Sequence, residues 1–337
     1  MTEIIHCLKL LFLGVAGFVV VGITHAAGQG VEQELTEEQR QELELLASAV
    51  STVLQSQSVW TEQPLDWVNE FLKSSKQTTF VPFTFSVEQR ELSTPTIAIY
   101  ILVEPQQAMS EPERCDPVFE EAYHIELGAP TLAGAYEISA GFWGQSGDYD
   151  VYVAVSESEV SSGTEPRTLM FKKEVSIPNL WSEQLAASSV ILAERIDVLP
   201  SPPSPSQLLL NPYTLGNLRI IPKMTPEYSP PGEFISAFFI YNAGLTVSGM
   251  PDVRVDYTFS TRGLQGGQFF DRTTPQMFNE RTLPQDFDVT AGHQLAAGQI
   301  VPLSALPVDD YRLVIKVTDN TNGAVLMRSV DFSVASP

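Results

Sequence analysis

Alternation of apolar and polar residues with a period of two is the feature that most constrains this fold. The pattern begins near residue 78 and recurs in short segments, separated by turn residues, to the end of the chain. Such a period places every second side chain on one face of an extended strand, so each segment predicts a half-buried β-strand. In "TFVPFTFSVE", for example, the residues that share one face are Val81, Phe83, Phe85 and Val87.

The predicted strands fall into two series. The first lies in residues 77–199 and includes "TIAIYILVE" (96–104), whose apolar residues on both faces predict a central strand covered on both sides. The second lies in residues 208–337, which we expect to fold alone. It includes a strand predicted at "QDFDVTA" (285–291) and a glycine-rich, polar segment, 263–284, that we expect to be irregular. Four prolines in the segment 200–207 favour a stiff, extended connector between the two series. Short strands at this spacing indicate a mainly β fold made of two tandem immunoglobulin-like or fibronectin-like β-sandwiches.

One strand pattern occurs twice. "DYDVYVAVSE" begins at Asp148 and "DYRLVIKVTD" at Asp310, and in both an acidic residue and a tyrosine precede strict alternation. We interpret the two as the same late strand of successive sandwiches, so the repeat is structural and not a duplicated active site. Tyr149 and Tyr311 are placed like tyrosine-corner residues, whose hydroxyl groups tie a loop to the sheet. The side chains expected to point inward are Val151, Val153 and Val155 in the first strand and Leu313, Ile315 and Val317 in the second.

The first residues of the chain predict an export signal. An apolar run over residues 10–23 follows Lys9 and ends in small residues around Ala26. This run is shorter than the roughly 20 residues that span a bilayer, and it has the length of a signal-peptide core. We therefore predict a signal peptide over residues 1–26, with an uncleaved anchor as the alternative. The mature chain would be periplasmic, envelope-associated or extracellular, without stable membrane insertion.

Residues 27–76 predict a helical segment before the first sandwich. Thr36 and Gln39 are spaced as a capping box at the start of a helix. A second, shorter helix is predicted over residues 64–74. The first helix either packs on the domain that follows or mediates self-association. Its apolar face is expected to contain Leu43, Leu46, Ala47, Val50, Val53 and Leu54.

Charge and cysteine content limit the classes of partner. The formal net charge is −22, which repels nucleic acid and anionic lipid headgroups. We therefore expect no nucleic-acid partner. Cys7 would leave with the signal peptide, so Cys115 has no cysteine with which to pair within the chain. Acidic neighbours disfavour its thiolate form, and we interpret Cys115 as an inert loop thiol.

No sequence motif indicates a catalytic, cofactor or metal site. The histidines after the signal, His124 and His293, lie in unrelated segments, and the sequence contains neither an HExxH motif nor a G-x-S-x-G motif. The segment 318–329 resembles a calcium loop in its glycine, but Thr318 and Ser329 stand where the loop needs carboxylates. We expect no catalytic residue, no cofactor and no metal.

Aromatic residues beside turns are the better candidates for contact with a partner. Exposed aromatic side chains can stack on sugars or fill a pocket of another protein. The alternative is that these residues cap the open ends of the sandwiches. The candidates are Phe142, Trp143, Phe269, Phe270 and Phe278.

Several stretches resemble an exported bacterial family. "DWVNEFLKSSKQTTFVPFTFSVE", "SSVILAERIDVL", "NPYTLGNLRIIPKMTPEYSPPGEFISAFFIYN" and "DYRLVIKVTDNTNGAVLMRSVDFSV" look like the C-terminal region of uncharacterised exported proteins of the VWFA-related or GWxTD-domain type. The likeness covers most of the chain after Asp66. The sequence lacks the D-x-S-x-S metal-adhesion motif and the G-W-x-T-D string, so the resemblance implies the paired β-sandwich region alone.

These observations predict an exported, non-enzymatic interaction or structural module that binds a protein or a glycan at the cell envelope or outside the cell. The alternative is a carbohydrate-active hydrolase, or an accessory protein, with a carboxylate site between the two domains. Acidic side chains gathered in one cleft would favour the hydrolase. An exposed aromatic row or an unpaired sheet edge would favour binding.

Overall fold

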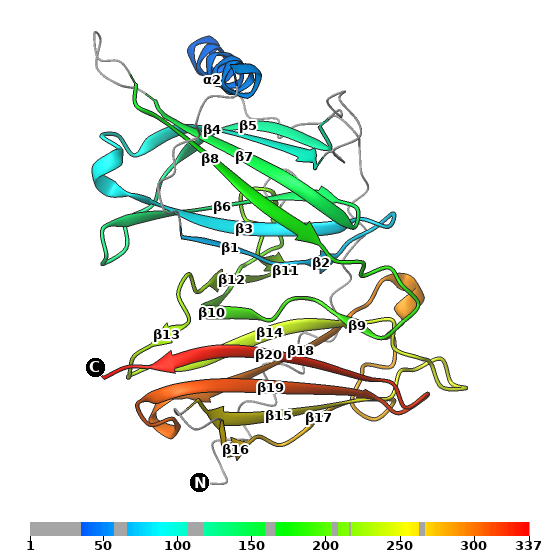
Figure 1. The fold of residues 1–337 in the computed structure, drawn as a ribbon. Coiled ribbons are helices and arrows are strands. Elements are labelled where there is room, and N and C mark those ends of the chain that lie inside the picture. The colour runs from blue at the N-terminus through cyan, green and yellow to red at the C-terminus, as the bar shows by residue number, and fades with distance from the viewer. Residues whose placement is uncertain are drawn as a thin grey trace.

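The computed structural model describes residues 35–56, 66–106, 117–158, 166–203, 208–215, 217–262 and 267–336. One long helix, α2 (Glu37–Ser56), precedes the strands β1 to β20, which form four sheets. The mainly β fold with an N-terminal helix is therefore confirmed. We number the sheets 1 to 4 in the order in which they stack, beginning with the sheet that lies next to α2 (Figure 1).

Sheets 1 and 2 form the N-terminal sandwich. Sheet 1 has the order β5 (Phe119–Glu126), β4 (Thr96–Pro105), β7 (Gly147–Glu157) and β8 (Thr168–Ile177). In sheet 2, β3 (Thr79–Glu88) pairs with β6 (Ala135–Gly144), β1 (Trp67–Asn69) and β2 (Leu72–Lys73). The turn η1 (Gln89–Glu91) follows β3.

Sheets 3 and 4 form the C-terminal sandwich. Sheet 3 has the order β11 (Thr214–Leu215), β12 (Leu218–Pro222), β10 (Ile191–Val198), β14 (Glu233–Tyr241) and β18 (Leu295–Pro302), with β9 (Ala186–Ala187) also beside β14. Sheet 4 has the order β13 (Glu227–Tyr228), β20 (Val325–Val334), β19 (Asp309–Asp319), β15 (Val253–Thr261) and β16 (Gln268–Arg272), with β17 (Gln276–Phe278) also beside β15. Two further turns are η2 (Val289–Ala291) and η3 (Leu303–Ala305).

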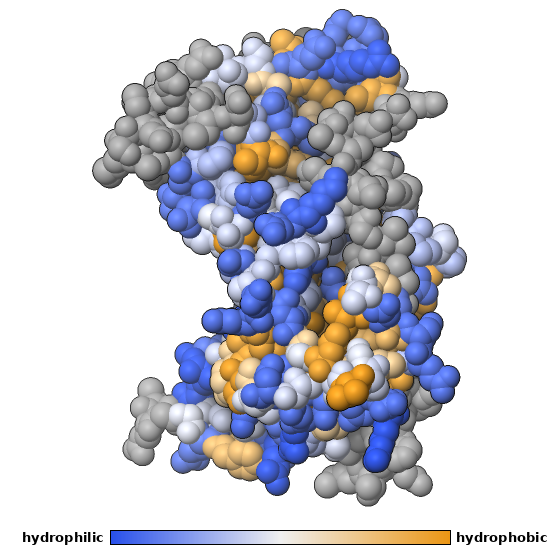
Figure 2. Space-filling view, turned by 90° about the vertical axis from the view of Figure 1, so that its right-hand side faces the viewer, coloured by the Kyte–Doolittle hydropathy of each residue, from blue (hydrophilic) through white to orange (hydrophobic). Residues whose placement is uncertain are grey.

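The helix covers the outer face of sheet 1. The Thr36 hydroxyl accepts a hydrogen bond from the backbone N–H of Gln39, whose side chain in turn accepts from the N–H of Thr36, so the predicted capping box is present. Figure 2 shows a hydrophilic outer surface on the helix with hydrophobic residues beneath it. The helix buries Leu43, Leu46 and Val50 against Ala98, Tyr100, Leu102, Tyr152 and Ala154 of sheet 1. Strand β4 is therefore covered on both faces, as its sequence predicted.

The core residues predicted for the two repeated strands are buried. On β7 the three valines at 151, 153 and 155 are at most 1% exposed, and on β19 the side chains of Leu313, Ile315 and Val317 are fully buried. The two strands are thus central strands of sheets 1 and 4, each paired on both sides.

A continuous apolar junction joins the two sandwiches. Phe80 of sheet 2 belongs to the same buried cluster as Ile191, Ile235 and Phe239 of sheet 3. Strand β14 is buried at every position after Glu233, which shows that both of its faces are covered. Sheets 2 and 3 therefore each pack on a sheet on either side.

Three details of the sequence interpretation are wrong. Residues 64–74 were expected to form a helix within a helical segment 27–76, but β1 and β2 pair with β3, and the Trp67 ring stacks on Phe83 at 4.4 Å. The strand predicted around 285–291 is the turn η2, whose start is capped by the Asp288 side chain. The segment expected to be irregular, 263–284, contains β16 and β17.

The largest difference concerns β10. It lies in the segment assigned by sequence to the first sandwich, 77–199, yet it pairs with β12 and β14 of the second. Its alternation fits either sandwich, and only long-range pairing decides between them. The C-terminal sandwich therefore includes residues before the proline-rich segment.

Candidate contact surface

The outer face of sheet 4 is the surface with the most distinctive chemistry. The inward residues of β15 and β19 are buried, so their alternate residues form this outer face. Its basic side chains outnumber its acidic ones, in a chain whose net charge is −22. The five basic ones are Arg254, Arg262, Arg272, Arg312 and Lys316, and the four acidic ones are Glu227, Asp256, Asp310 and Asp331.

Ion pairs hold three of the five basic groups of this face. Arg254 Nη2 lies 2.6 Å from Asp256, and Arg312 holds both carboxylate oxygens of Asp331, at 2.6 and 2.8 Å. Arg262 approaches the same Asp331 at 3.2 Å. The hydrogen bond from Arg254 lowers the pKa of Asp256, and the hydrogen bonds from Arg312 lower the pKa of Asp331. Both carboxylates therefore stay ionised and keep the arginines in place.

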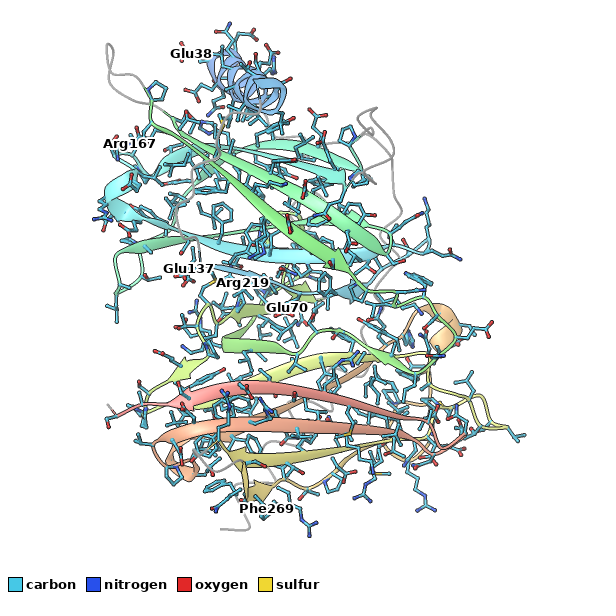
Figure 3. The ribbon with its side chains drawn as sticks, viewed as in Figure 1. Glu38, Glu70, Glu137, Arg167, Arg219 and Phe269 are labelled. Atoms are coloured by element: carbon cyan, nitrogen blue, oxygen red, sulfur yellow. The ribbon has the colours of Figure 1, made fainter. Side chains whose placement is uncertain are left out.

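Exposed apolar side chains flank the basic groups. Phe269 on β16 is 67% exposed, and on β20 Val325 and Met327 are 53% and 51% exposed. Figure 3 labels Phe269 at the end of the molecule farthest from α2. A surface that combines arginine with an exposed aromatic ring has the composition of binding sites for proteins and sugars.

The side chains of the other four aromatic candidates are less exposed to a partner. Phe142 is fully buried in the N-terminal core, and Phe278 is only 6% exposed, so neither can serve as a contact residue. Trp143 is partly buried and packs on Phe80 at 5.0 Å. Phe270 is also partly buried, with its ring edge-on to Tyr311 at 5.4 Å. The local sequence pattern did not reveal which side of the chain each ring faces, and only Phe269 projects into water.

The two repeated tyrosines lie at equivalent places in their sandwiches. The Tyr149 hydroxyl donates to the carbonyl oxygen of Gln145 at 3.1 Å, and the Tyr311 hydroxyl donates to that of Pro307 at 2.8 Å. Both rings are buried at the start of a central strand. This is the geometry of a tyrosine corner, which fixes the loop before the strand.

A serine, a histidine and a glutamate meet beneath α2, a cluster that the sequence did not reveal. His124 Nε2 lies 2.6 Å from the Ser158 hydroxyl and 3.3 Å from the Glu42 carboxylate, and Ser158 also hydrogen-bonds Glu42. A hydrolytic triad needs the acid at Nδ1 and the serine at Nε2. Here both lie at Nε2, and Ser158 is 1% exposed. The cluster therefore ties the helix to sheet 1.

One crevice at the junction holds carboxylates from both sandwiches. A cavity of about 270 Å³ is lined by Tyr136 and Glu137 of β6 and by Glu194 and Arg195 of β10, among others. Burial and the charge of Glu194 raise the pKa of Glu137, whereas Lys223 lowers it. Both glutamates are exposed to water, which limits the effect of each charge on the other.

Glu70 is a buried carboxyl group at the same junction, and Figure 3 labels it between the two sandwiches. It is 8% exposed, and burial raises its pKa to about 8, although a hydrogen bond with the Ser189 side chain lowers it in part. Ser189 also accepts a hydrogen bond from the backbone N–H of Phe71 at 3.0 Å. Glu70 therefore belongs to a polar contact between sheet 2 and the segment before β10.

The described residues contain no group of three or more His, Cys, Asp or Glu side chains that could hold a metal ion. In the segment 318–329, which resembles a calcium loop, both carboxylate oxygens of Asp319 accept hydrogen bonds, from donors that include the backbone N–H groups of Gly244 at 2.7 Å and Thr321 at 2.9 Å. Asp319 thus anchors the β19–β20 hairpin. Cys115 lies outside the described residues.

No helix in the described part of the chain is both long enough and apolar enough to cross a membrane. The sequence matches no protein-family model and none of the curated proteins with which it was compared. The resemblance to the VWFA-related and GWxTD-domain proteins therefore stays a prediction.

Proposed function

We propose that this protein is an exported, non-enzymatic binding module that contacts a protein or a glycan at the cell envelope or outside the cell. The observation that carries the proposal is the outer face of sheet 4, where Phe269 projects into water and Ser260 alone separates it from Arg312, which Asp331 holds in place. Aromatic and arginine side chains supply much of the binding energy at protein interfaces, and aromatic rings also stack on sugars.

The architecture supports this role. The four sheets and α2 form one stack in which sheets 2 and 3 are covered on both sides (Figure 1). The outer face of sheet 4 is consequently presented at one end of a stiff scaffold. A binding residue on a rigid strand loses little conformational entropy when it meets a partner.

Export rests on the first 26 residues, which lie outside the described part of the chain. We expect the natural protein to begin at Ala27. Mass spectrometry of the protein recovered from its natural source would reveal the N-terminus, and an intact Met1 would contradict the cleaved signal.

The hydrolase alternative has one observation in its favour, the pair Glu137 and Glu194 at the junction. A glycosidase needs one protonated and one ionised carboxyl group on either side of the scissile bond. If the pair were catalytic, Glu137→Gln would abolish release of reducing sugar from glycans of the cell envelope. We favour binding because both carboxylates are open to water, where a strongly raised pKa is hard to maintain.

Site-specific crosslinking tests the binding role. A photoreactive phenylalanine analogue at position 269 should crosslink a protein, or retain a glycan, of the envelope fraction. The matched control is the same analogue at Leu45 of α2, which is 71% exposed against 67% for Phe269. We expect adducts at 269 that an excess of unlabelled protein removes, with glycan-array binding as the parallel readout. Equal yields from both positions, or no partner at either, would overturn the proposal.

A further inference from the structure

Among the described residues, no strand lies beside one edge of β20 over most of its length. Strand β20 pairs with β19 from Val325 to Val334, but on its other side β13 reaches only Ser333 and Val334. The N–H of Ser333 donates to Pro226 on that side, at 2.9 Å. Successive residues of a strand direct their backbone groups to opposite sides. The N–H and C=O groups of Val325, Met327, Ser329 and Asp331 therefore face the edge where no other described strand lies.

Apolar side chains near this edge are only partly buried. They pack against the C-terminal core and are Leu326 and Val330 of β20, Val190 just before β10, and Leu192 of β10. The first pair and the second pair lie close together, because Arg328 Nη2 reaches the carbonyl oxygen of Ala187 at 3.5 Å. A further strand beside β20 would cover these partly exposed apolar side chains.

Arg328 gives this edge a chemical preference. It lies opposite Ile315, which is fully buried, so its side chain is on the inward face of β20. Its guanidinium contacts the carbonyl oxygens of Met327 and Ala187, and the ion pairs of the described residues do not include it. Burial lowers the pKa of Arg328. A partly buried cation whose contacts are neutral is stabilised when a carboxylate reaches it.

We propose that the β20 edge, Val325–Asp331, receives an extended segment of a partner protein as an added strand, with an acidic side chain facing Arg328. The proposal rests on the binding role above and names the class of partner. Residues two before and two after the acidic one would share its face and cover Leu326 and Val330. The segment thus has the form apolar-x-acidic-x-apolar, and its backbone would pair with Met327 and Ser329 as in other cases of strand addition.

A second copy of β20 does not meet this requirement. The inward residues of β20 are Leu326, Arg328, Val330, Phe332 and Val334, none of which is acidic. Asp331 lies on the outer face, where Arg312 holds it. Antiparallel pairing of two β20 edges would place both partners' inward faces on the same side, so no antiparallel register brings a carboxylate to Arg328.

Designed peptides test the proposal with the full chain. The probe is KVTVTETVTVK, which places valines and one glutamate on the same face, and the control is KVTVTKTVTVK. Since a hydrogen bond to a charged group contributes about 1.5–3 kcal/mol, we expect the glutamate peptide to bind at least about tenfold more tightly. Arg328→Glu should reverse the preference. Hydrogen exchange should slow at the amides of Met327, Ser329 and Asp331.

A proline variant blocks the edge without breaking the sheet. Ser329→Pro removes an N–H that faces away from β19, so the variant should fold, as its thermal melt would show, and lose peptide binding. Equal affinity for the two peptides, unchanged binding by Ser329→Pro, or slow exchange at these amides in a peptide-free dimer would overturn the proposal. If crosslinking at position 269 persists in Ser329→Pro, the protein still binds a partner through the outer face of sheet 4. Only the proposal for the β20 edge would then be rejected.

Discussion

Tyr149 and Tyr311 occupy the same structural position in the two sandwiches, each donating its hydroxyl hydrogen bond to the carbonyl oxygen four residues upstream. Each tyrosine thereby joins the loop before a central strand to the strand itself. The sequence pattern occurs twice because each sandwich uses a tyrosine at this position to fix the loop before its central strand. Tyr311 also stacks on Phe332 at 5.3 Å, so its ring contributes to the core as well as to the corner.

Substitution of Tyr311 separates these two contributions. Tyr311→Phe removes the hydrogen bond and should lower the free energy of unfolding by about 0.5–1.5 kcal/mol. Tyr311→Ala also removes a fully buried ring, and should cost about 3–5 kcal/mol. The exposed neighbour Lys316→Ala should stay within about 0.5 kcal/mol of wild type. Urea denaturation of the three variants measures this order, and an equal loss for Tyr311→Ala and Lys316→Ala would contradict it.

The strands could be predicted from the sequence because alternation is a local signal. The capping box of Thr36 and Gln39 located the helix for the same reason. Residues 64–74 have apolar spacing that fits a helix equally well, and pairing with β3 decides the outcome. The placement of β10 depends on its partners β12 and β14, which follow it in sequence, and no local pattern identifies them.

The candidate surface was harder to predict than the fold. Phe142 and Phe269 both stand in glycine-containing segments, yet one is fully buried and the other 67% exposed. Which face a ring takes depends on the register of its strand with its neighbours. Arg328 did have a sequence signal, because alternation places it on the same face as Leu326 and Val330. That no described acidic side chain forms an ion pair with it could be seen only in three dimensions.

Truncation tests the pairing of β10. A fragment of residues 208–337 lacks β10, which lies between β12 and β14, and should show no cooperative thermal unfolding. A fragment of residues 182–337 retains β9 and β10 and should unfold cooperatively. Its midpoint should be below that of the full chain, because Ile235 and Phe239 lose their cover from sheet 2. Identical melts of the two fragments by circular dichroism would show that β10 is dispensable.

Two adjacent leucines test how α2 docks. Leu46 is 3% exposed beneath the helix, whereas Leu45 is 71% exposed on its outer side. Leu46→Ala should cost about 2–5 kcal/mol and speed hydrogen exchange throughout α2. Leu45→Ala should change stability by less than about 0.5 kcal/mol if the helix is not an interface between copies. Sedimentation of Leu45→Ala at high concentration checks self-association, which a drop in mass relative to wild type would reveal.

Glu70 predicts a specific dependence of stability on pH. Its pKa is raised from 4.5 to about 8 by burial, so between these values the folded state keeps a proton that the unfolded state has lost. The contribution of Glu70 is therefore most favourable below pH 4.5 and decreases as the pH rises toward 8. The slope expected from this one group is a loss of about 1.4 kcal/mol per pH unit.

Comparison with Glu70→Gln isolates this effect from the other acidic groups. Glutamine keeps the size of the side chain and can still hydrogen-bond Ser189, but it does not titrate. The free energies of unfolding of wild type and Glu70→Gln, measured by urea denaturation at pH 5, 6, 7 and 8, should therefore differ by an amount that changes in the same direction at each step. The free energy of unfolding of wild type should fall relative to that of Glu70→Gln at each step. Parallel curves would mean that Glu70 is ionised in the folded protein at pH 5, and that sheets 2 and 3 accommodate its charge.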